Sequence, residues 1–333
     1  MKKIWNFIKR SYVVILLYII VFLSCVIELP YYIDAPGGLI NVSARITVDG
    51  KYESKGSINL AYVTEYSVNL PMLIASYFHD DWTLHKIESK EEQINHEEAF
   101  VRDKLLMEES YANAIIVAYR CAGIDIEINS SDIYVAYLLE EARTDLVVGD
   151  KIIKIDNKTI VSKKDLSEQL SSKSVGDKLA IDVINNEKEY VRYAEVIEYE
   201  GVKLIGFVPV EINKYETNPH IEIATEASEY GPSGGLMVTL AVYDALTEVD
   251  ITGGLTIVGT GTISLDGTVG SIGGVEYKIK GAVKKGADIF FVPLGENYEE
   301  AREIVSKNKY DIILVPVASF EEALDYLFKN VVK

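Results

Sequence analysis

The chain has 333 residues, of which 48% are hydrophobic and 25% charged, and its formal net charge is −18. This length is enough for about two compact domains, and the balance of residue types excludes a wholly disordered chain. The negative charge argues against nucleic acid or an anionic lipid surface as the main partner, because both are bound by basic patches. Two cysteines, Cys25 and Cys121, form neither a disulfide framework nor a C-x-x-C metal site. A look-alike of the zinc-protease motif at His96 has Phe100 where the second histidine is needed, so we expect no metal and no cofactor.

The first 28 residues predict a membrane anchor. Four basic residues within "MKKIWNFIKR" precede "SYVVILLYIIVFLSCVI", a run without charge that stops before Glu28. The run is near the lower length limit for a spanning helix, and its basic flank is expected to stay in the cytoplasm. A cleaved signal peptide is the alternative, but no small-x-small cleavage site follows the run. We therefore expect a cytoplasmic segment over 1–10, a single transmembrane helix over 11–28, and the rest of the chain outside the cell at its membrane.

Residues 29–125 are predicted to form an extracytoplasmic segment that packs on the C-terminal domain. The stretch "LPYYIDAPGGLINV" is typical of an extended exit from the membrane. Between Ile46 and Glu65, two alternating runs joined by polar, glycine-containing turns predict a β-hairpin. From about Asn69 to Ala122 the pattern is mainly helical, and Gly123 is expected to end the helix.

A compact mixed unit follows over 126–200. It begins with the strand "DIYVAYLL", continues through the turns and strand of "LVVGDKIIKIDNKTI", and adds the helix "SKKDLSEQLSS", for which Ser162 is the expected cap. Two further strands are joined through Asn185 and Asn186. This order resembles a PDZ domain over about seventy residues, and the resemblance implies capture of an extended peptide by addition to a sheet edge. The glycine-rich loop that would hold a terminal carboxylate is missing around "INSSDIY", so a unit that binds no peptide stays open as the alternative.

The last part, 201–333, alternates strands and helices. It predicts a domain that contains both helices and strands, α/β in pattern and α+β in architecture, with its own core. The strand "HIEIATE" is followed by a helix after Ser233 and by glycine-rich strands up to "GTVGSIGGV". Then come the helix "EYKIKGAVKKGA", the buried strand "DIFFVPL", a second helix, the strand "DIILVPV" and a final helix with Ser319 at its start. The expected architecture is thus this domain, a small mixed PDZ-like domain and an N-terminal transmembrane helix.

The stretch "GPSGG" places Ser233 in the G-x-S-x-G pattern of α/β-hydrolases, which predicts a histidine later in the chain. All the histidines precede Ser233; they are His79, His85, His96 and His220. The absence of a later histidine argues against an α/β-hydrolase esterase. Either the serine is structural or its base is a lysine or a carboxylate.

A lysine can act as a base only when it is neutral, which requires burial and a depressed pKa. In the helix after Gly274, the apolar residues define a stripe, and Lys278 falls on its margin, whereas Lys280 and Lys284 point towards solvent. Periodicity alone therefore nominates Lys278 as the base. It leaves open a surface lysine that extends its amine to solvent.

Two motifs carry a resemblance to a known family. The segments "GPSGG" and "GTGTISLDGTVGSIGGVEYK" are very similar to the Lon-type serine proteases. The resemblance implies that Ser233 is the nucleophile, that Lys278 is its base and that Thr260 orients the lysine. Two positions depart from the family pattern: Gly234 stands where alanine is usual, and Tyr230 replaces the acidic residue of ATP-dependent members.

The whole arrangement resembles the membrane-anchored PDZ–Lon-like proteases of Gram-positive bacteria, some of which process secreted peptide pheromones. The chain has no G-x-x-x-x-G-K-[ST] motif, so we expect no ATP-driven unfolding of substrates. The resemblance implies a serine endopeptidase with a Ser-Lys dyad that cleaves extended peptides or unfolded proteins near the cell membrane. The competing hypothesis is a membrane-tethered, peptide-binding scaffold with a degenerate protease domain.

Overall fold

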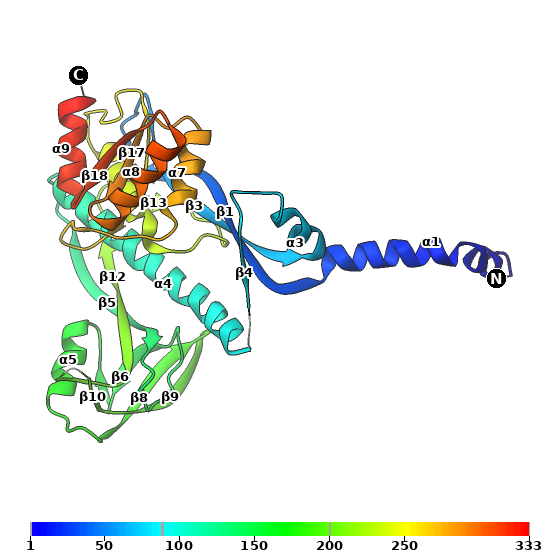
Figure 1. Ribbon diagram of the computed structural model, residues 1–333. Helices are drawn as coiled ribbons and strands as arrows, with labels where there is room; N and C mark the ends of the chain where they lie inside the picture. Colours follow the sequence, from blue (N-terminus) through cyan, green and yellow to red (C-terminus); the bar gives the residue numbers. More distant parts are fainter. Residues whose placement is uncertain (1, 88–89, 200, 333) are drawn as a thin grey trace.

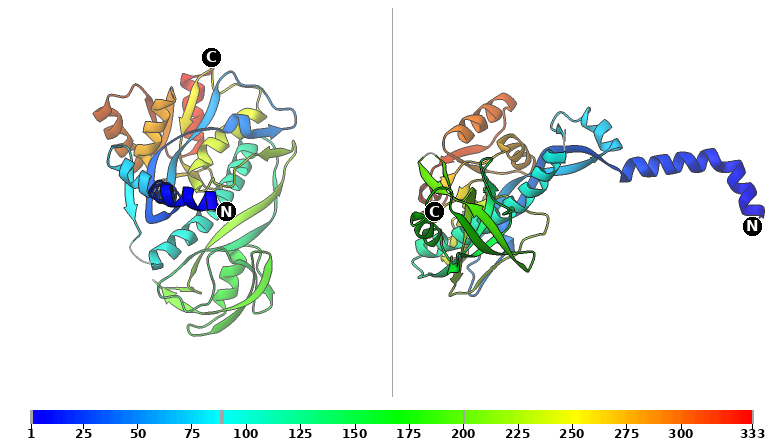
Figure 2. Two further views of the ribbon diagram at one scale, coloured as in Figure 1. Left: turned by 90° about the vertical axis from the view of Figure 1, so that its right-hand side faces the viewer. Right: turned by 90° about the horizontal axis from the view of Figure 1, so that it is seen from below.

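The computed structural model describes residues 2–87, 90–199 and 201–332, and within them the side chains of all but 2–10 and 90–95. An α/β body contains the C-terminus, a smaller β-rich unit lies beside it, and helix α1 projects from the body at its opposite end (Figures 1 and 2). The cytoplasmic segment predicted over 1–10 lies outside the described side chains.

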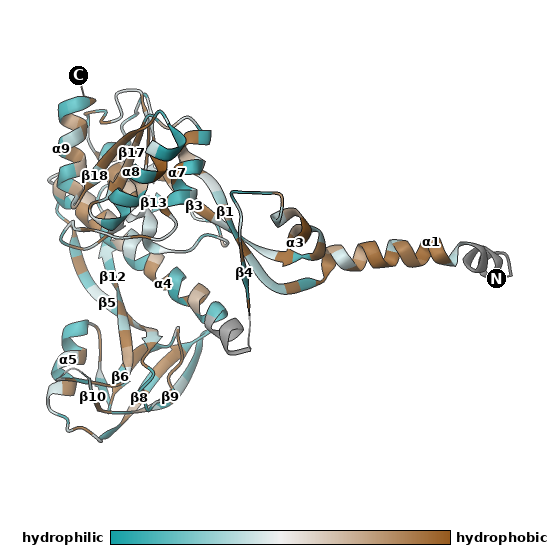
Figure 3. Cartoon of the chain, viewed as in Figure 1, coloured by the Kyte–Doolittle hydropathy of each residue, from teal (hydrophilic) through white to brown (hydrophobic). Residues whose placement is uncertain are grey.

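Helix α1 covers Lys2–Val26, and its described surface is strongly apolar (Figure 3). The chain enters strand β1 at Glu28, so the helix ends two residues before the predicted boundary. Among the helices in the described part of the chain, none combines the length and the apolar character that crossing a membrane requires. The described side chains of this helix begin only at residue 11, and the transmembrane helix predicted over 11–28 is not found among them.

The body is built on a six-stranded sheet in the order β18-β17-β14-β3-β1-β4. The four strands from β18 to β3 run parallel, and β1 pairs antiparallel with both β3 and β4. These strands are β1 (Glu28–Asn41), β3 (Ser57–Asn69), β4 (Thr83–Lys86), β14 (Thr256–Gly259), β17 (Ile289–Pro293) and β18 (Ile313–Val317).

Helices cover both faces of this sheet. Since successive strand residues point to opposite faces, Phe291 of β17 joins the cluster with α6, whereas Phe290 packs in the cluster with α7. The helices of the body are α2 (Val42–Arg45), α3 (Leu70–Ser76), α6 (Gly235–Leu246), α7 (Val275–Lys284), α8 (Glu296–Asn308) and α9 (Phe320–Asn330). The predicted cap of the last helix is present, because Ser319 Oγ accepts from the Glu322 N–H at 3.2 Å.

The β-hairpin predicted between Ile46 and Glu65 is wrong. Strand β2 (Ile46–Val48) pairs with β13 (Ile221–Ile223), and β3 pairs with β1 in a register that runs from Glu28 opposite Asn69 to Asn41 opposite Asn59. Alternation of apolar and polar residues identifies strands but not which strands pair. The partner of β3 is β1, which lies in the segment that was expected to be an extended exit from the membrane. Residues 28–69 therefore contribute two strands to the sheet of the body instead of packing on it from outside.

The β-rich unit contains the sheet β12-β5-β6-β8-β9, with β7 paired to β6. The predicted elements over 126–198 are present, including the Ser162 cap, whose Oγ accepts from the Asp165 N–H at 3.1 Å. The predicted boundary of this unit, residue 200, lies outside the described residues. Strand β12 lies beyond that boundary and pairs with β5 along its length. The elements are β5 (Glu127–Leu138), β6 (Lys151–Ile155), β7 (Lys158–Thr159), α5 (Lys163–Ser171), β8 (Lys178–Asn185), β9 (Lys188–Glu195), β10 (Ile197–Tyr199), β11 (Val202–Leu204) and β12 (Phe207–Glu216).

Helix α4 (Lys90–Cys121) runs between the two units and packs on α6 of the body and on β12 of the β-rich unit (Figure 1). The predicted helical region is thus interrupted only around β4. As expected, Gly123 follows the helix in a left-handed conformation, with φ of 73°, and its N–H donates to the Arg120 carbonyl.

Candidate active site

Ser233 lies in a single 3₁₀ turn, η1 (Pro232–Gly234), that leads directly into α6. Gly231 before the turn has φ of 96°, which is unfavourable for any residue with a side chain. A Cβ atom at Gly235 would lie 2.3 Å from Ser110 Oγ and 2.8 Å from the Ile263 nitrogen. The glycines around Ser233 are therefore required by the shape of the turn and by the close approach of α4 and β15 (Thr262–Ile263).

Gly234 is explained by its neighbour on the sheet. A Cβ atom at this position would meet Leu60 Cδ2 at 2.8 Å and Tyr111 Cε1 at 3.5 Å. The Leu60 side chain from β3 thus occupies the space that an alanine methyl group would need. The departure from the family's usual alanine fits this local packing and does not disturb the turn.

Lys278 lies in α7 with only 4% of its surface exposed. Its Nζ donates to Thr260 Oγ1 at 3.1 Å, and burial lowers the pKa of the amine to about 7. Lys280, two residues later, instead forms ion pairs with Asp81 and Glu276, which raise the pKa of its amine. The two lysines of one helix therefore differ in environment, and Lys278 is the one suited to be neutral near pH 7. Lys280 was predicted to point towards solvent, but its side chain is only 16% exposed and lies in these ion pairs.

Thr260 is fully buried and joins the lysine to the serine turn. Its Oγ1 accepts from Lys278 and donates to the Ser233 carbonyl at 3.1 Å, and the Gly261 N–H donates to the same carbonyl at 2.8 Å. The segment after β14 is thereby fixed against the turn that carries Ser233. The structure places all three sequence-predicted residues, Ser233, Lys278 and Thr260, in one hydrogen-bonded neighbourhood.

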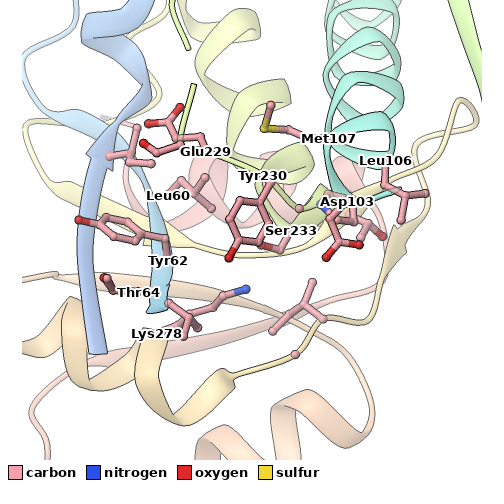
Figure 4. Close-up of a pocket in the computed structure, with 18 of the residues that line it drawn as sticks. Leu60, Tyr62, Thr64, Asp103, Leu106, Met107, Glu229, Tyr230, Ser233 and Lys278 are labelled. Atoms are coloured by element: carbon pink, nitrogen blue, oxygen red, sulfur yellow. The ribbon is translucent and has the colours of Figure 1, made fainter. Parts of the chain in front are cut away.

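Ser233 and Lys278 both line a cavity of about 970 Å³, whose other walls come mainly from β1, β3, α4 and the loop that leads to Ser233. Figure 4 shows the Lys278 amine pointing into this cavity towards the turn of Ser233. None of the histidines is among the described residues that line it. The arrangement offers a hydroxyl and a desolvated amine to a bound molecule, and it offers no imidazole base.

The walls of the cavity were not predicted from the sequence. Leu60 and Tyr62 come from β3, Met107 from α4, and Tyr230 from the loop before the turn (Figure 4). The Tyr230 hydroxyl donates to Glu65 Oε1 at 3.4 Å, and burial together with nearby carboxylates raises its pKa to about 12. The sequence had marked Tyr230 as a departure from the Lon-type pattern, whereas Leu60, Tyr62 and Met107 lie in a strand and a helix whose partners the pattern did not reveal.

The comparisons with known proteins agree with the motifs of the C-terminal part. Residues 206–330 match the model of the Lon protease (S16) C-terminal proteolytic domain. The chain is 31% identical over 131 residues to the Lon protease of Mycoplasmopsis agalactiae and 36% identical over 100 residues to Lon protease 2 of Bacillus subtilis. These matches cover 39% and 30% of this chain, but only 12% and 17% of the relatives. The chain therefore carries a Lon-type proteolytic domain, which supports a serine peptidase.

Part of the chain is also similar to a solved structure. The PDZ domain of an SdrC-like protein from Listeria monocytogenes is 22% identical, and the similarity covers 25% of this chain and 93% of that domain, with a TM-score of 0.23.

Proposed function

We propose that this protein is a serine endopeptidase in which Ser233 is the nucleophile, Lys278 the general base and Thr260 the residue that orients the lysine. The observation that carries the proposal is the buried Lys278 amine, with a pKa of about 7, pointing into the cavity that Ser233 also lines. A lysine with this pKa is about half neutral at pH 7 and mostly neutral one pH unit above it, and the neutral amine is the state that accepts a proton.

In the proposed reaction, neutral Lys278 accepts the proton of the Ser233 hydroxyl as its oxygen attacks the substrate carbonyl carbon. The peptide C–N bond breaks, the lysine returns the proton to the leaving amine, and an acyl-enzyme remains. Water then attacks the ester carbonyl carbon and gives a proton to Lys278. The lysine returns this proton to Ser233 Oγ as the ester C–O bond breaks, and the carboxylic acid product leaves the free enzyme. Backbone N–H groups of the η1 turn that carries Ser233 are the proposed donors to the oxyanion. Pro232 is excluded because it has no N–H, and the N–H groups of Gly235 and Leu236 already donate to the Pro232 and Gly261 carbonyls.

The proposed substrate is an extended peptide or an unfolded segment of a protein. A cavity of about 970 Å³ can receive several side chains, and it is lined by apolar groups such as Leu60 and Met107 as well as by polar ones. We propose that the PDZ-like unit binds or gates this substrate and that cleavage needs no ATP. The absence of a phosphate-binding motif from this sequence supports the second point.

We also propose that the N-terminal part attaches the enzyme to the cell membrane, with the proteolytic domain on the outer side. From residue 11 onward the apolar side chains of α1 are mostly exposed. The patch continues onto α3 and the turn after it, where Tyr77 and Phe78 are 77% and 80% exposed. Asn69 fixes the two helices together, because its Oδ1 caps α3 at the Met72 N–H and its Nδ2 donates to the Cys25 carbonyl at 2.9 Å. Apolar and aromatic side chains of this kind favour a lipid interface.

The test is cleavage of unstructured peptides by the full chain in detergent without ATP. Wild type is expected to cleave, and both Ser233→Ala and Lys278→Ala are expected to lose activity. Lys280→Ala is the matched control, since it removes a lysine from the same helix that points away from Ser233. Activity in Lys278→Ala would disprove the dyad, and an inactive wild type that still binds peptides would favour the tethered scaffold.

A further inference from the structure

A second cavity, of about 440 Å³, adjoins the turn that carries Ser233. Three parts of the molecule meet around it: the body, helix α4 and the PDZ-like unit. Its walls include Pro232 and Ile263 of the body, Ser110 and Asn113 of α4, and Lys163, Glu211 and Asn213 of the PDZ-like unit. Polar side chains of α4 and β12 line this space and connect the turn of Ser233 and the strand after Thr260 with the PDZ-like sheet.

Ser110 connects α4 to the turn itself. Its side chain is 3% exposed, and its Oγ donates to the Pro232 carbonyl at 2.9 Å. Pro232 is the residue directly before the proposed nucleophile. A Cβ atom at residue 235 would lie only 2.3 Å from the same hydroxyl. Ser110 therefore contacts the turn on both sides of Ser233.

Asn113 lies one helical turn after Ser110 and connects two other elements. Its Nδ2 donates to the Ile263 carbonyl at 3.3 Å, and its Oδ1 accepts from Asn213 Nδ2 at 3.4 Å. Asn213, on β12, in turn accepts at its Oδ1 from Ser131 Oγ of β5 at 3.0 Å. A continuous row of hydrogen bonds thus runs from the PDZ-like sheet through α4 to the strand that follows Thr260.

We propose that Ser110 and Asn113 are positioning residues of the peptidase. Ser110 fixes the turn of Ser233, and Asn113 fixes the strand after Thr260 and joins it to the PDZ-like sheet. The inference rests on the proposed peptidase function but concerns residues outside the dyad. Both side chains are buried, and a buried carbonyl that loses its donor is not readily compensated, so the backbone it belongs to shifts or loosens.

The experiment uses the full chain and two measurements on the same variants. Peptide cleavage gives kcat and KM over a range of pH, and hydrogen exchange reports the opening of the backbone amides in 231–236 and 260–265. Ser110→Ala is expected to lower kcat about 2- to 10-fold, which is the effect of one neutral hydrogen bond. KM and the pH at which activity falls are expected to stay unchanged, because substrate contacts and the Lys278 environment are intact. Exchange is expected to rise in 231–236.

The row of bonds through Asn113 predicts a second signature. Asn113→Ala and Asn213→Ala are each expected to lower kcat and to raise exchange in 260–265. Because the bonds lie in series, the double variant is expected to be no worse than Asn113→Ala alone. Simple independent destabilisation would instead give additive losses, and that result would overturn the role of Asn113 as a link.

Two controls separate positioning from folding. Ser167→Ala removes an exposed hydroxyl that donates to the Lys163 carbonyl within its own helix, and it is expected to change neither measurement. Ser110→Thr keeps the hydroxyl and is expected to recover activity. Unchanged kcat and unchanged exchange in Ser110→Ala would refute the inference. If wild type proves inactive, the peptidase proposal fails, whereas the exchange measurement still decides whether Ser110 and Asn113 hold the turn and the strand.

Discussion

Replacing Lys278 with methionine should abolish activity and make the protein more stable. Methionine has a similar length and no charge, so it fills the same buried space without a cost for desolvating an amine. The pKa of Lys278 falls from 10.5 to about 7 on folding. Each unit corresponds to about 1.4 kcal/mol, so near neutral pH the lysine costs the folded state roughly 3 to 5 kcal/mol.

The pH dependence follows from the same shift. Between about pH 7 and 10.5 the unfolded chain binds the proton that the folded protein has lost, so the stability of wild type rises with pH across this window. Lys278→Met should not show that rise. The cleavage rate of wild type should increase as the pH passes 7, because the base becomes neutral, and at pH 5 it should be roughly 100-fold lower than its plateau.

Two measurements at several pH values test these predictions. Thermal unfolding followed by circular dichroism gives the stability, and kcat/KM for a peptide gives the activity. Lys280→Met is the comparison, since it removes an ion-paired, raised-pKa lysine of the same helix. The reasoning is refuted if Lys278→Met unfolds at a lower temperature than wild type, or if wild-type activity is unchanged between pH 5 and 8.

Further predictions concern the residues around the dyad. Thr260→Val removes the acceptor of the Lys278 amine and should lower kcat about 10-fold with little change in KM, as steady-state kinetics would show. Gly235→Ala should prevent the turn of Ser233 from forming, because the added methyl group would meet Ser110 and the Ile263 backbone nitrogen. We expect this variant to lose cooperative thermal unfolding, and an unfolding transition like that of wild type would contradict the prediction. Gly234→Ala should lower the unfolding temperature, and adding Leu60→Val should recover part of the loss; equal losses with and without the second change would show that Leu60 is not the obstacle.

The candidate dyad of Ser233 and Lys278 could be proposed from the sequence because its signals are local. The glycines next to Ser233 reflect the shape of the turn at Gly231 and the close approach of other segments at Gly234 and Gly235. The position of Lys278 on the margin of an apolar stripe follows from the period of one helix. The resemblance to Lon-type proteases then joined the two motifs and added Thr260. The structure supplies what these patterns lacked, namely the burial of the amine and the bonds through Thr260 that hold it against the turn.

The remainder of the site depends on contacts between segments far apart in the chain. Asn213 and Asn113 are 100 residues apart, and Asn113 and Ile263 are separated by 150. Neither helical periodicity nor strand alternation marks a buried asparagine as a bridge, since the residue only interrupts an apolar face. The sequence therefore indicated that α4 is a helix without indicating that it carries polar contacts to the catalytic turn.

The incorrect hairpin has a larger consequence for the body. Strand β3 lies in the middle of the sheet, parallel to β14 on one side and antiparallel to β1 on the other, and it supplies Leu60 beside the catalytic turn. The match to the Lon proteolytic domain begins only at residue 206 and contains neither β1 nor β3. Segment 206–330 alone would thus expose the edge of β14 and lose one wall of the cavity. The N-terminal strands are consequently part of the body that carries Ser233 and Lys278. Helix α4 and the β-rich unit are inserted in the chain between these strands and the motifs that the sequence makes recognisable.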